Sequence, residues 1–158
     1  MARLPARSPA KPASPAAPSQ SRTSARTVAY WATTALVAAE MAMGGIWDVL
    51  RTPQVTAVTD RLGYPSYFLV ILGVWKLLGA VALLAPRRPR LKEWAYAGAV
   101  FNYTGAIASH LAVGGADPGT LVFLLALTGL TAASWTLRPP ARRDLAPSRA
   151  SLWASPAR

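Results

Sequence analysis

Four long apolar segments alternate with short polar segments along the chain, and they predict four membrane-spanning helices. Their approximate bounds are 28–50, 66–85, 94–113 and 120–137. Each has about 18 to 23 residues, near the roughly 20 that an α-helix needs to cross about 30 Å of hydrocarbon. The segments are continuously apolar instead of alternating, which excludes a pore-like β-barrel. The pattern therefore predicts an all-α fold, a four-transmembrane-helix bundle.

A shorter helix is predicted between the first and second spans, at about 53–62. Thr52 stands before Pro53, which is typical of an N-cap followed by proline at the first helical position. Gly63 can end this helix, and Pro65 prevents its continuation. Apolar residues repeat at helical spacing within it. We predict an amphipathic helix that lies on the membrane surface, with an ordinary structured loop as the alternative.

The two ends of the chain differ from its apolar centre. Residues 1–27 and 139–158 are rich in Ala, Pro, Ser and Arg. Such segments have too little apolar surface to bury, so we expect both to be disordered, basic cytoplasmic tails. The rest of the chain, 28–138, is then one membrane domain.

The basic residues give the predicted helices an orientation. The chain has 17 Lys and Arg against 6 Asp and Glu, a formal net charge of +11. Fourteen of the basic residues lie in or beside the tails and between the second and third spans, and two lie between the first and second. Cytoplasmic segments carry an excess of Lys and Arg, so both termini are predicted in the cytoplasm. Because the charge lies outside the apolar blocks and not along one polar face, we expect no binding to nucleic acid.

Two residue types restrict the chemistry that the chain can perform. It contains no Cys and a single His, His110. Disulfides, Fe–S clusters and Cys-ligated zinc are excluded, and one His cannot form a two-His metal site within one chain. The sequence also has no nucleophile–base arrangement, no phosphate loop and no set of cofactor ligands. We therefore expect no metal site and no activity as a stand-alone enzyme.

Polar residues near the middle of the spans are the first candidates for function. A charge at the bilayer centre costs roughly 2.5–3.5 kcal/mol on insertion scales. Counted from the cytoplasmic end, Glu40 lies about 18 Å along its span, Lys76 about 14 Å and Asn102 about 12 Å. We expect these three to form an intramembrane polar layer in which Glu40 faces Lys76. The pair is either a structural ion pair that fixes helix register or a functional site for a proton or a polar head group.

A second polar layer is predicted near the outer surface. Asp48 lies at about 30 Å and His110 at about 24 Å, and Tyr67 is close to that level. Polar groups near an interface can simply be hydrated. The alternative is a His–carboxylate pair that exchanges a proton with a ligand from the outer side.

The spacing of the polar residues predicts which helix faces meet. Asp48 follows Glu40 by eight residues, and His110 follows Asn102 by eight, so each pair stays within about 80° around its helix. One face of the first span can therefore meet one face of the third at both levels. Small residues also indicate close packing. They include Gly98 and Gly105 on the third span, Gly44 and Gly45 on the first, and Gly73 and Gly79 on the second.

Three segments together resemble the DoxX family of small bacterial membrane proteins, in its DoxX-like branch. They read GGIWDVLRTP, LGYPSYFLVILGVWKLLGAVALLAP and LKEWAYAGAVFNYTGAIASHL, and the resemblance covers about residues 28–138. It implies a four-helix, multi-pass protein of the bacterial cytoplasmic (inner) membrane. The family takes its name from a subunit tied to quinone-linked sulfur oxidation, other members are associated with oxidative-stress complexes, and most have no assigned activity. No catalytic motif carries over residue by residue.

Three functions compete at this point. The first, favoured by the resemblance and by the outer polar layer, is an accessory subunit that binds a quinone or a lipid for a partner oxidoreductase. The second is a small proton-coupled transporter that uses Glu40 and Lys76, although four helices without an inverted repeat are a thin basis for it. The third is a structural or assembly factor, in which that pair only holds helices together. Each is compatible with membrane lipid as a partner and with an oligomer.

Overall fold

The computed structural model of the protein describes residues 20–139, which form five α-helices and no strand. The helices are α1 (Gln20–Leu50), α2 (Pro53–Arg61), α3 (Ser66–Leu84), α4 (Pro89–Val113) and α5 (Pro118–Leu137). The predicted all-α fold is confirmed. The predicted tails fall almost wholly outside the described residues, except that α1 begins at Gln20, inside the segment for which we expected a tail.

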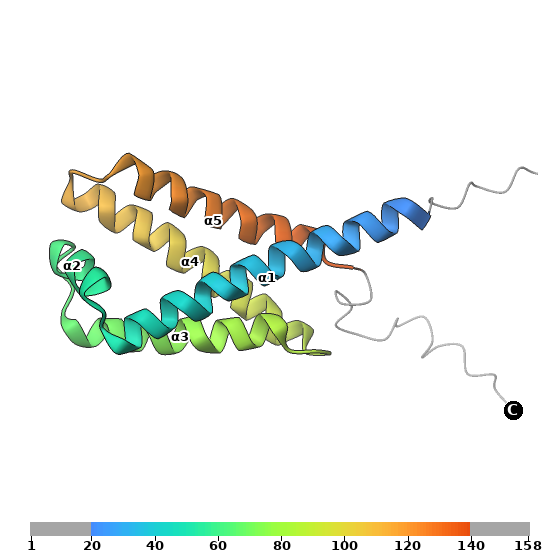
Figure 1. Cartoon of the computed structure of the whole chain (residues 1–158), viewed down its shortest axis with the longest axis horizontal. Coiled ribbons are helices and arrows are strands. Elements are labelled where there is room, and N and C mark those ends of the chain that lie inside the picture. Colours follow the sequence, from blue (N-terminus) through green and yellow to red (C-terminus); the bar gives the residue numbers. More distant parts are fainter. Residues whose placement is uncertain (1–19, 140–158) are drawn as a thin grey trace, which may run out of the picture.

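The four long helices run in alternating directions along one axis, and α2 lies at the end where α1 turns into α3 (Figure 1). α1 packs most extensively on α3 and also contacts α5, while α4 packs on both α3 and α5. The start of α1 therefore lies beside the end of α5. There the Arg26 side chain donates a hydrogen bond to the Thr136 carbonyl at 3.1 Å. This contact joins α1 to α5 near the start of α1.

The helix ends follow local sequence signals. Thr52 is the N-cap residue of α2 and Pro53 its first helical residue, as predicted, although the Thr52 side chain makes no capping hydrogen bond. Gly63, with a φ of 77°, follows this helix in the left-handed conformation that glycine adopts without strain. The short helix predicted at 53–62 is therefore confirmed.

At the start of α5 the Asp117 carboxylate accepts a hydrogen bond from the Thr120 amide at 2.7 Å.

The interior of the bundle is a mixture of apolar and aromatic side chains. The buried cluster includes Val37, Met41, Leu83, Tyr96, Tyr103 and Leu127. The outer surface is also apolar, with Trp94 80% and Phe101 75% exposed. Soluble monomers rarely expose large apolar surfaces. A bundle whose exterior is apolar as well as its interior therefore indicates a hydrocarbon environment.

Two of the predicted spans match helices that are long and apolar enough to cross a membrane, namely α3 and α5. Over the described residues, α1 and α4 fall below that level of hydropathy. Their lengths of 31 and 25 residues are sufficient. Polar residues such as Glu40 in α1 and Asn102 in α4 lower the mean hydropathy of these two helices. Four long helices therefore lie where four spans were predicted. Two of them, α3 and α5, are also apolar enough to cross a membrane.

α1 and α3 approach each other closely where Gly45 faces Gly73. A Cβ atom added to Gly73 would lie 2.6 Å from the Gly45 carbonyl oxygen, and one added to Gly45 would lie 2.9 Å from the Gly73 carbonyl oxygen. The predicted packing at these glycines is confirmed. The corresponding prediction for α4 is wrong, because Gly98 and Gly105 are exposed and a Cβ on either would meet nothing within 4 Å.

Candidate functional site

The ionisable residues of the first two spans gather on one side of α1. Glu40, Gly44 and Asp48 are spaced four residues apart, so they form a stripe along this helix. Lys76 reaches the stripe from α3, and Tyr103 reaches it from α4. Three helices therefore bring two carboxylates, an ammonium group and a phenol together inside an otherwise apolar bundle. We call these four side chains the intramembrane cluster.

Lys76 forms its ion pair with Asp48, at 2.9 Å between Nζ and Oδ2, and not with Glu40 as we expected. Both side chains are nearly buried, with 15% and 5% of their surface exposed. The close contact of Gly45 and Gly73 explains the choice of partner. It places the Lys76 Cβ 3.1 Å from where a Cβ on Gly45 would be. From that level Asp48 is three residues away along α1, whereas Glu40 is five residues away in the other direction.

Glu40 has a different partner, since its carboxylate accepts a hydrogen bond from the Tyr103 hydroxyl. Tyr103 is buried, but Glu40 is only partly so. Gly44 lies between the two acidic residues of the stripe and is itself half-buried. A Cβ added there would lie 3.4 Å from Glu40 Oε1 and 3.4 Å from Lys76 Nζ. Both charged groups therefore border the position that a side chain at Gly44 would occupy.

The residues predicted for the outer layer are not brought together around Asp48. Tyr67 is 63% exposed. His110 is half-buried and, among the described residues, makes no hydrogen bond or ion pair with Asp48 or Tyr67. Asn102, assigned to the inner layer, is likewise half-buried and not bonded to Glu40 or Lys76. The two predicted layers therefore merge through Asp48 and Lys76, and Tyr103 stands where we expected its neighbour Asn102.

A second polar group lies deeper in the packing between α1, α4 and α5. The Thr34 and Ser134 hydroxyls are 2.7 Å apart, and the Tyr96 hydroxyl lies 2.8 Å from that of Ser134. All three residues are buried. Thr34 also donates to the Tyr30 carbonyl one turn earlier in its own helix, at 2.7 Å. Buried hydroxyls need such partners, so this group fixes how α1, α4 and α5 fit together.

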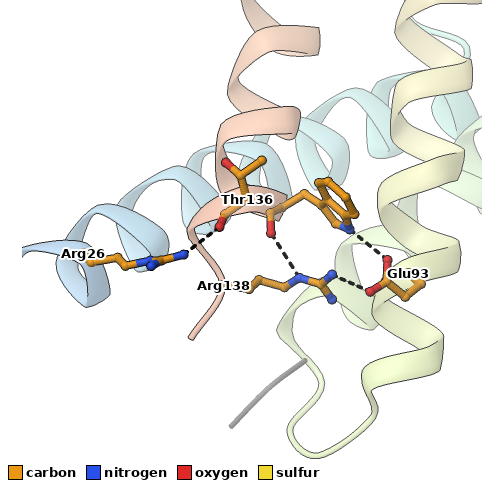
Figure 2. A pocket seen from close by; sticks show the side chains of 5 residues that line it. Arg26, Glu93, Thr136 and Arg138 are labelled. Carbon is orange, nitrogen blue, oxygen red and sulfur yellow. Dashed lines mark hydrogen bonds and ion pairs between the residues drawn. The ribbon is translucent and has the colours of Figure 1, made fainter. Parts of the chain in front are cut away.

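A pocket of about 430 Å³ opens at the end of α5, next to the starts of α1 and α4. Figure 2 shows its lining, in which Arg26 and Arg138 approach the last turn of α5 from opposite sides. Arg138 Nε donates to the Trp135 carbonyl at 3.3 Å, and its Nη2 donates to Glu93. The Trp135 indole nitrogen also donates to Glu93, at 2.8 Å. We call this the α5-end pocket.

Electrostatics at the α5-end pocket are dominated by Arg138. Partial burial by itself would raise the pKa of the Glu93 carboxyl. The hydrogen bonds from Arg138 and Trp135, together with the attraction of the Arg138 charge, outweigh burial and hold this pKa below its usual value. The Arg138 guanidinium also stacks over the Tyr96 ring, 5.3 Å from its centre. The pocket thus combines a fixed, buried cation with an ionised acid at its rim.

Comparison with known proteins identifies the family of the chain. A model of the DoxX-like family matches residues 32–134. The chain belongs to the DoxX-like family. Neither the curated proteins nor the solved structures contain a match to it. Family membership together with the apolar helices indicates a membrane protein, as the resemblance implied.

The match to the DoxX-like family extends over every residue of the intramembrane cluster, Glu40, Asp48, Lys76 and Tyr103. The α5-end pocket is divided, because Glu93 lies within the matched range and Arg26 and Arg138 lie outside it.

Sequence reasoning missed Tyr103, Ser134 and Arg138 for a common reason. The candidates were chosen first by charge within the apolar segments, which left out basic residues at segment ends, and Tyr67 was the one residue chosen for a hydroxyl group.

Proposed function

We propose that this DoxX-like protein spans the cytoplasmic membrane four times, with both termini in the cytoplasm, and holds a quinone head group for a partner oxidoreductase. The observation that carries the proposal is that a carboxylate and an ammonium group, from Glu40 and Lys76, both border the position that a side chain at Gly44 would occupy.

The four-span topology is supported by length and by the apolar exterior. α1 and α4, at 31 and 25 residues, are longer than α3 and α5, at 19 and 20, and lie alongside them. Large apolar side chains are exposed on all four helices, such as Leu36, Trp75, Phe101 and Val122. The excess of basic residues at the end shared by the α1 start and the α3–α4 turn supports a cytoplasmic location for that end.

The absence of native Cys makes the topology simple to test. Arg88→Cys lies in the α3–α4 turn and Gly115→Cys in the α4–α5 turn. In cells whose cytoplasmic membrane is intact but accessible from outside, a membrane-impermeant maleimide should label Gly115→Cys. It should label Arg88→Cys only after the cytoplasmic membrane has been permeabilised. Equal labelling of both variants in intact membranes would contradict the four-span topology.

A quinone fits the chemistry of the intramembrane cluster. Its head group accepts hydrogen bonds at two carbonyl oxygens, takes up protons when it is reduced, and dissolves in the hydrocarbon layer. Lys76 and Tyr103 supply donors, and Glu40 supplies a carboxyl group that can hold and release a proton. Because Glu40 and Gly44 are only partly buried, a ligand in the lipid can approach both. The chain then positions the head group, and the partner subunit carries out electron transfer.

Gly44→Ala tests this assignment without removing any polar group. The added methyl would make ordinary contacts at 3.4 Å with Glu40 and Lys76, so the fold should tolerate it. It would also occupy the space that Glu40 and Lys76 border, so a short-chain quinone should bind at least tenfold more weakly to the purified protein. Gly129→Ala, in open space on α5, is the matched control and should bind as the wild type does. Equal affinity of all three proteins, or no binding to any, would refute the quinone site.

A structural role is the second candidate, because Lys76 and Asp48 already satisfy each other's charge. If the cluster only holds helices together, replacing both members by apolar residues should leave stability and membrane respiration near wild-type values. In the quinone-binding proposal, the same double variant Lys76→Met/Asp48→Leu keeps its stability but loses quinone binding. The quinone affinity of this double variant therefore distinguishes the two functions.

A further inference from the structure

Two arginines from different parts of the chain bond to the carbonyl groups at the end of α5. The last carbonyl groups of an α-helix have no partner within the helix, and cations are favoured beside them. Arg26 donates to the Thr136 carbonyl and Arg138 to the Trp135 carbonyl. These bonds occupy only some of the N–H donors of each guanidinium group. The remaining donors are available to a ligand in the α5-end pocket if they face no acceptor in the protein.

Arg138 holds a donor for which the described residues supply no acceptor. The residue is only 3% exposed, and its Nε and Nη2 are bonded to Trp135 and Glu93. Its Nη1 is buried and has no hydrogen-bond partner within the part of the chain that the structure describes. A buried unpaired donor is costly, and the cost is greater for a charged group. Arg138 lines the pocket, so an acceptor bound there would complete its hydrogen bonds.

The chemistry of the lining favours an anion with several oxygen atoms. Arg26 and Arg138 against Glu93 leave one positive charge in excess among the lining residues. The planar fork of a guanidinium matches the oxygens of phosphate better than it matches a single acceptor. Arg26 is exposed at the rim, so it can turn towards a ligand without disturbing the core. The volume, about 430 Å³, lies in the range typical of small-molecule sites.

The surroundings of the pocket indicate how such an anion would arrive. Trp135 in its lining and Trp94 beside Glu93 are 47% and 80% exposed, as aromatic residues at a membrane surface are. Three further exposed arginines, Arg87, Arg88 and Arg90, lie at the same end of the bundle. Anionic lipids of the cytoplasmic leaflet are attracted to basic residues in this position. A lipid could place its phosphate in the pocket and its acyl chains along the apolar exterior.

We propose that the α5-end pocket binds the phosphate group of an anionic phospholipid from the cytoplasmic leaflet, between Arg26 and Arg138. The inference rests on the proposed insertion and orientation in the membrane, but not on quinone binding at the other site. Its ligand differs from the quinone in charge, and its residues are not shared with the intramembrane cluster.

Native mass spectrometry of the full-length protein released from detergent micelles gives a direct test. The protein is titrated with phosphatidylglycerol and, separately, with phosphatidylcholine, which has the phosphate without the net charge. We expect one phosphatidylglycerol to bind at least tenfold more tightly than phosphatidylcholine. Arg26→Gln should weaken that first binding step at least tenfold and Arg138→Gln more. Arg90→Gln, which removes an exposed arginine outside the pocket, should change it less than twofold.

The controls separate the outcomes. Arg138→Gln removes a buried residue and can unfold the protein, so the exposed Arg26→Gln carries the result in that case. Inorganic phosphate and glycerol 3-phosphate are added as competitors. Displacement of the lipid only at much higher concentrations of these ions supports a lipid site. Binding of inorganic phosphate as tight as that of the lipid would overturn the assignment to lipid. Equal weakening by Arg26→Gln and Arg90→Gln would overturn the pocket, because binding would then follow surface charge alone.

Discussion

The ion pairs Lys76–Asp48 and Arg138–Glu93 use the same chemistry in different surroundings. In the first, both side chains are nearly buried, at 15% and 5% exposed, and the pair lies between helices. In the second, Arg138 is 3% exposed but Glu93 is 38% exposed, so water screens one partner. In both places an aromatic donor also reaches a carboxylate, Tyr103 to Glu40 and Trp135 to Glu93. The two pairs thus differ in burial more than in residue type, and we expect burial to determine what each contributes to stability.

The largest effect should follow from breaking the buried pair. Lys76→Met leaves the buried Asp48 carboxylate without its partner, and we expect a loss of about 3–5 kcal/mol in unfolding free energy. Unfolding by a denaturing detergent, followed by circular dichroism, measures the loss. Val74→Met, on an exposed position of α3, is the control and should lie within about 0.5 kcal/mol of wild type. A loss below about 1 kcal/mol for Lys76→Met would mean that water reaches the pair.

Removing the phenol of the cluster should have the next largest effect. Tyr103→Phe keeps the buried ring but removes the hydrogen bond to the Glu40 carboxylate, and bonds to charged groups contribute about 1.5–3 kcal/mol. The same unfolding assay measures the change. Tyr67→Phe removes a hydroxyl from a 63% exposed residue, and we expect no measurable difference. Similar losses in the two variants would remove the distinction between buried and exposed positions.

The glycine contact that sets the level of Lys76 can be tested separately. In Gly73→Ala the new methyl would lie 2.6 Å from a backbone oxygen of α1, so the helices must move apart, at a cost of about 1–3 kcal/mol. Gly129→Ala meets no atom within 4 Å and should stabilise α5 by up to about 1 kcal/mol. Opposite signs in the unfolding assay are the expected result. A stabilising Gly73→Ala would contradict the close approach of α1 and α3.

The smallest effect is expected from pH at the α5-end pocket. The folded state holds the pKa of Glu93 below its unfolded value, so it favours the charged form. The stability that this contributes is present above the unfolded pKa, about 4.3, and is lost as pH falls through the folded pKa. Because Glu93 is 38% exposed, we expect less than about 1 kcal/mol. The stability difference between wild type and Glu93→Gln should therefore shrink between pH 6 and pH 3. A difference that grows towards low pH would reverse the sign of the shift.

Local sequence signals predicted the helices well, because each signal acts over a few residues. Thr52 with Pro53 located the start of α2, Gly63 located its end, and Gly45 with Gly73 indicated the contact of α1 with α3. These depend on backbone conformation and on the size of a side chain. Both are properties of the residue and its immediate neighbours.

The partners inside the bundle were harder to predict, because they depend on helix direction and register. The depth estimate treated each helix as perpendicular to the membrane, with α1 counted from Val28. α1 in fact crosses its neighbours obliquely (Figure 1), so equal distances along two helices are not equal depths. Lys76 therefore meets Asp48, which the estimate had placed about 16 Å further out. Tyr103 replaced Asn102 because one step along a helix turns a side chain by about 100°.

The length of α1 has a consequence for the kind of bilayer that the protein prefers. At 31 residues it is about 46 Å long, well beyond the roughly 30 Å of a hydrocarbon layer. In the proposed four-span arrangement the excess tilts within the layer or protrudes from it, and the first turns of α1 carry Arg26. A thicker bilayer would draw these turns towards the acyl chains, and a thinner one would leave them in water. Hydrophobic mismatch would thus set where Arg26 stands relative to the phosphate groups, and membrane thickness becomes a variable to which this end of the protein responds.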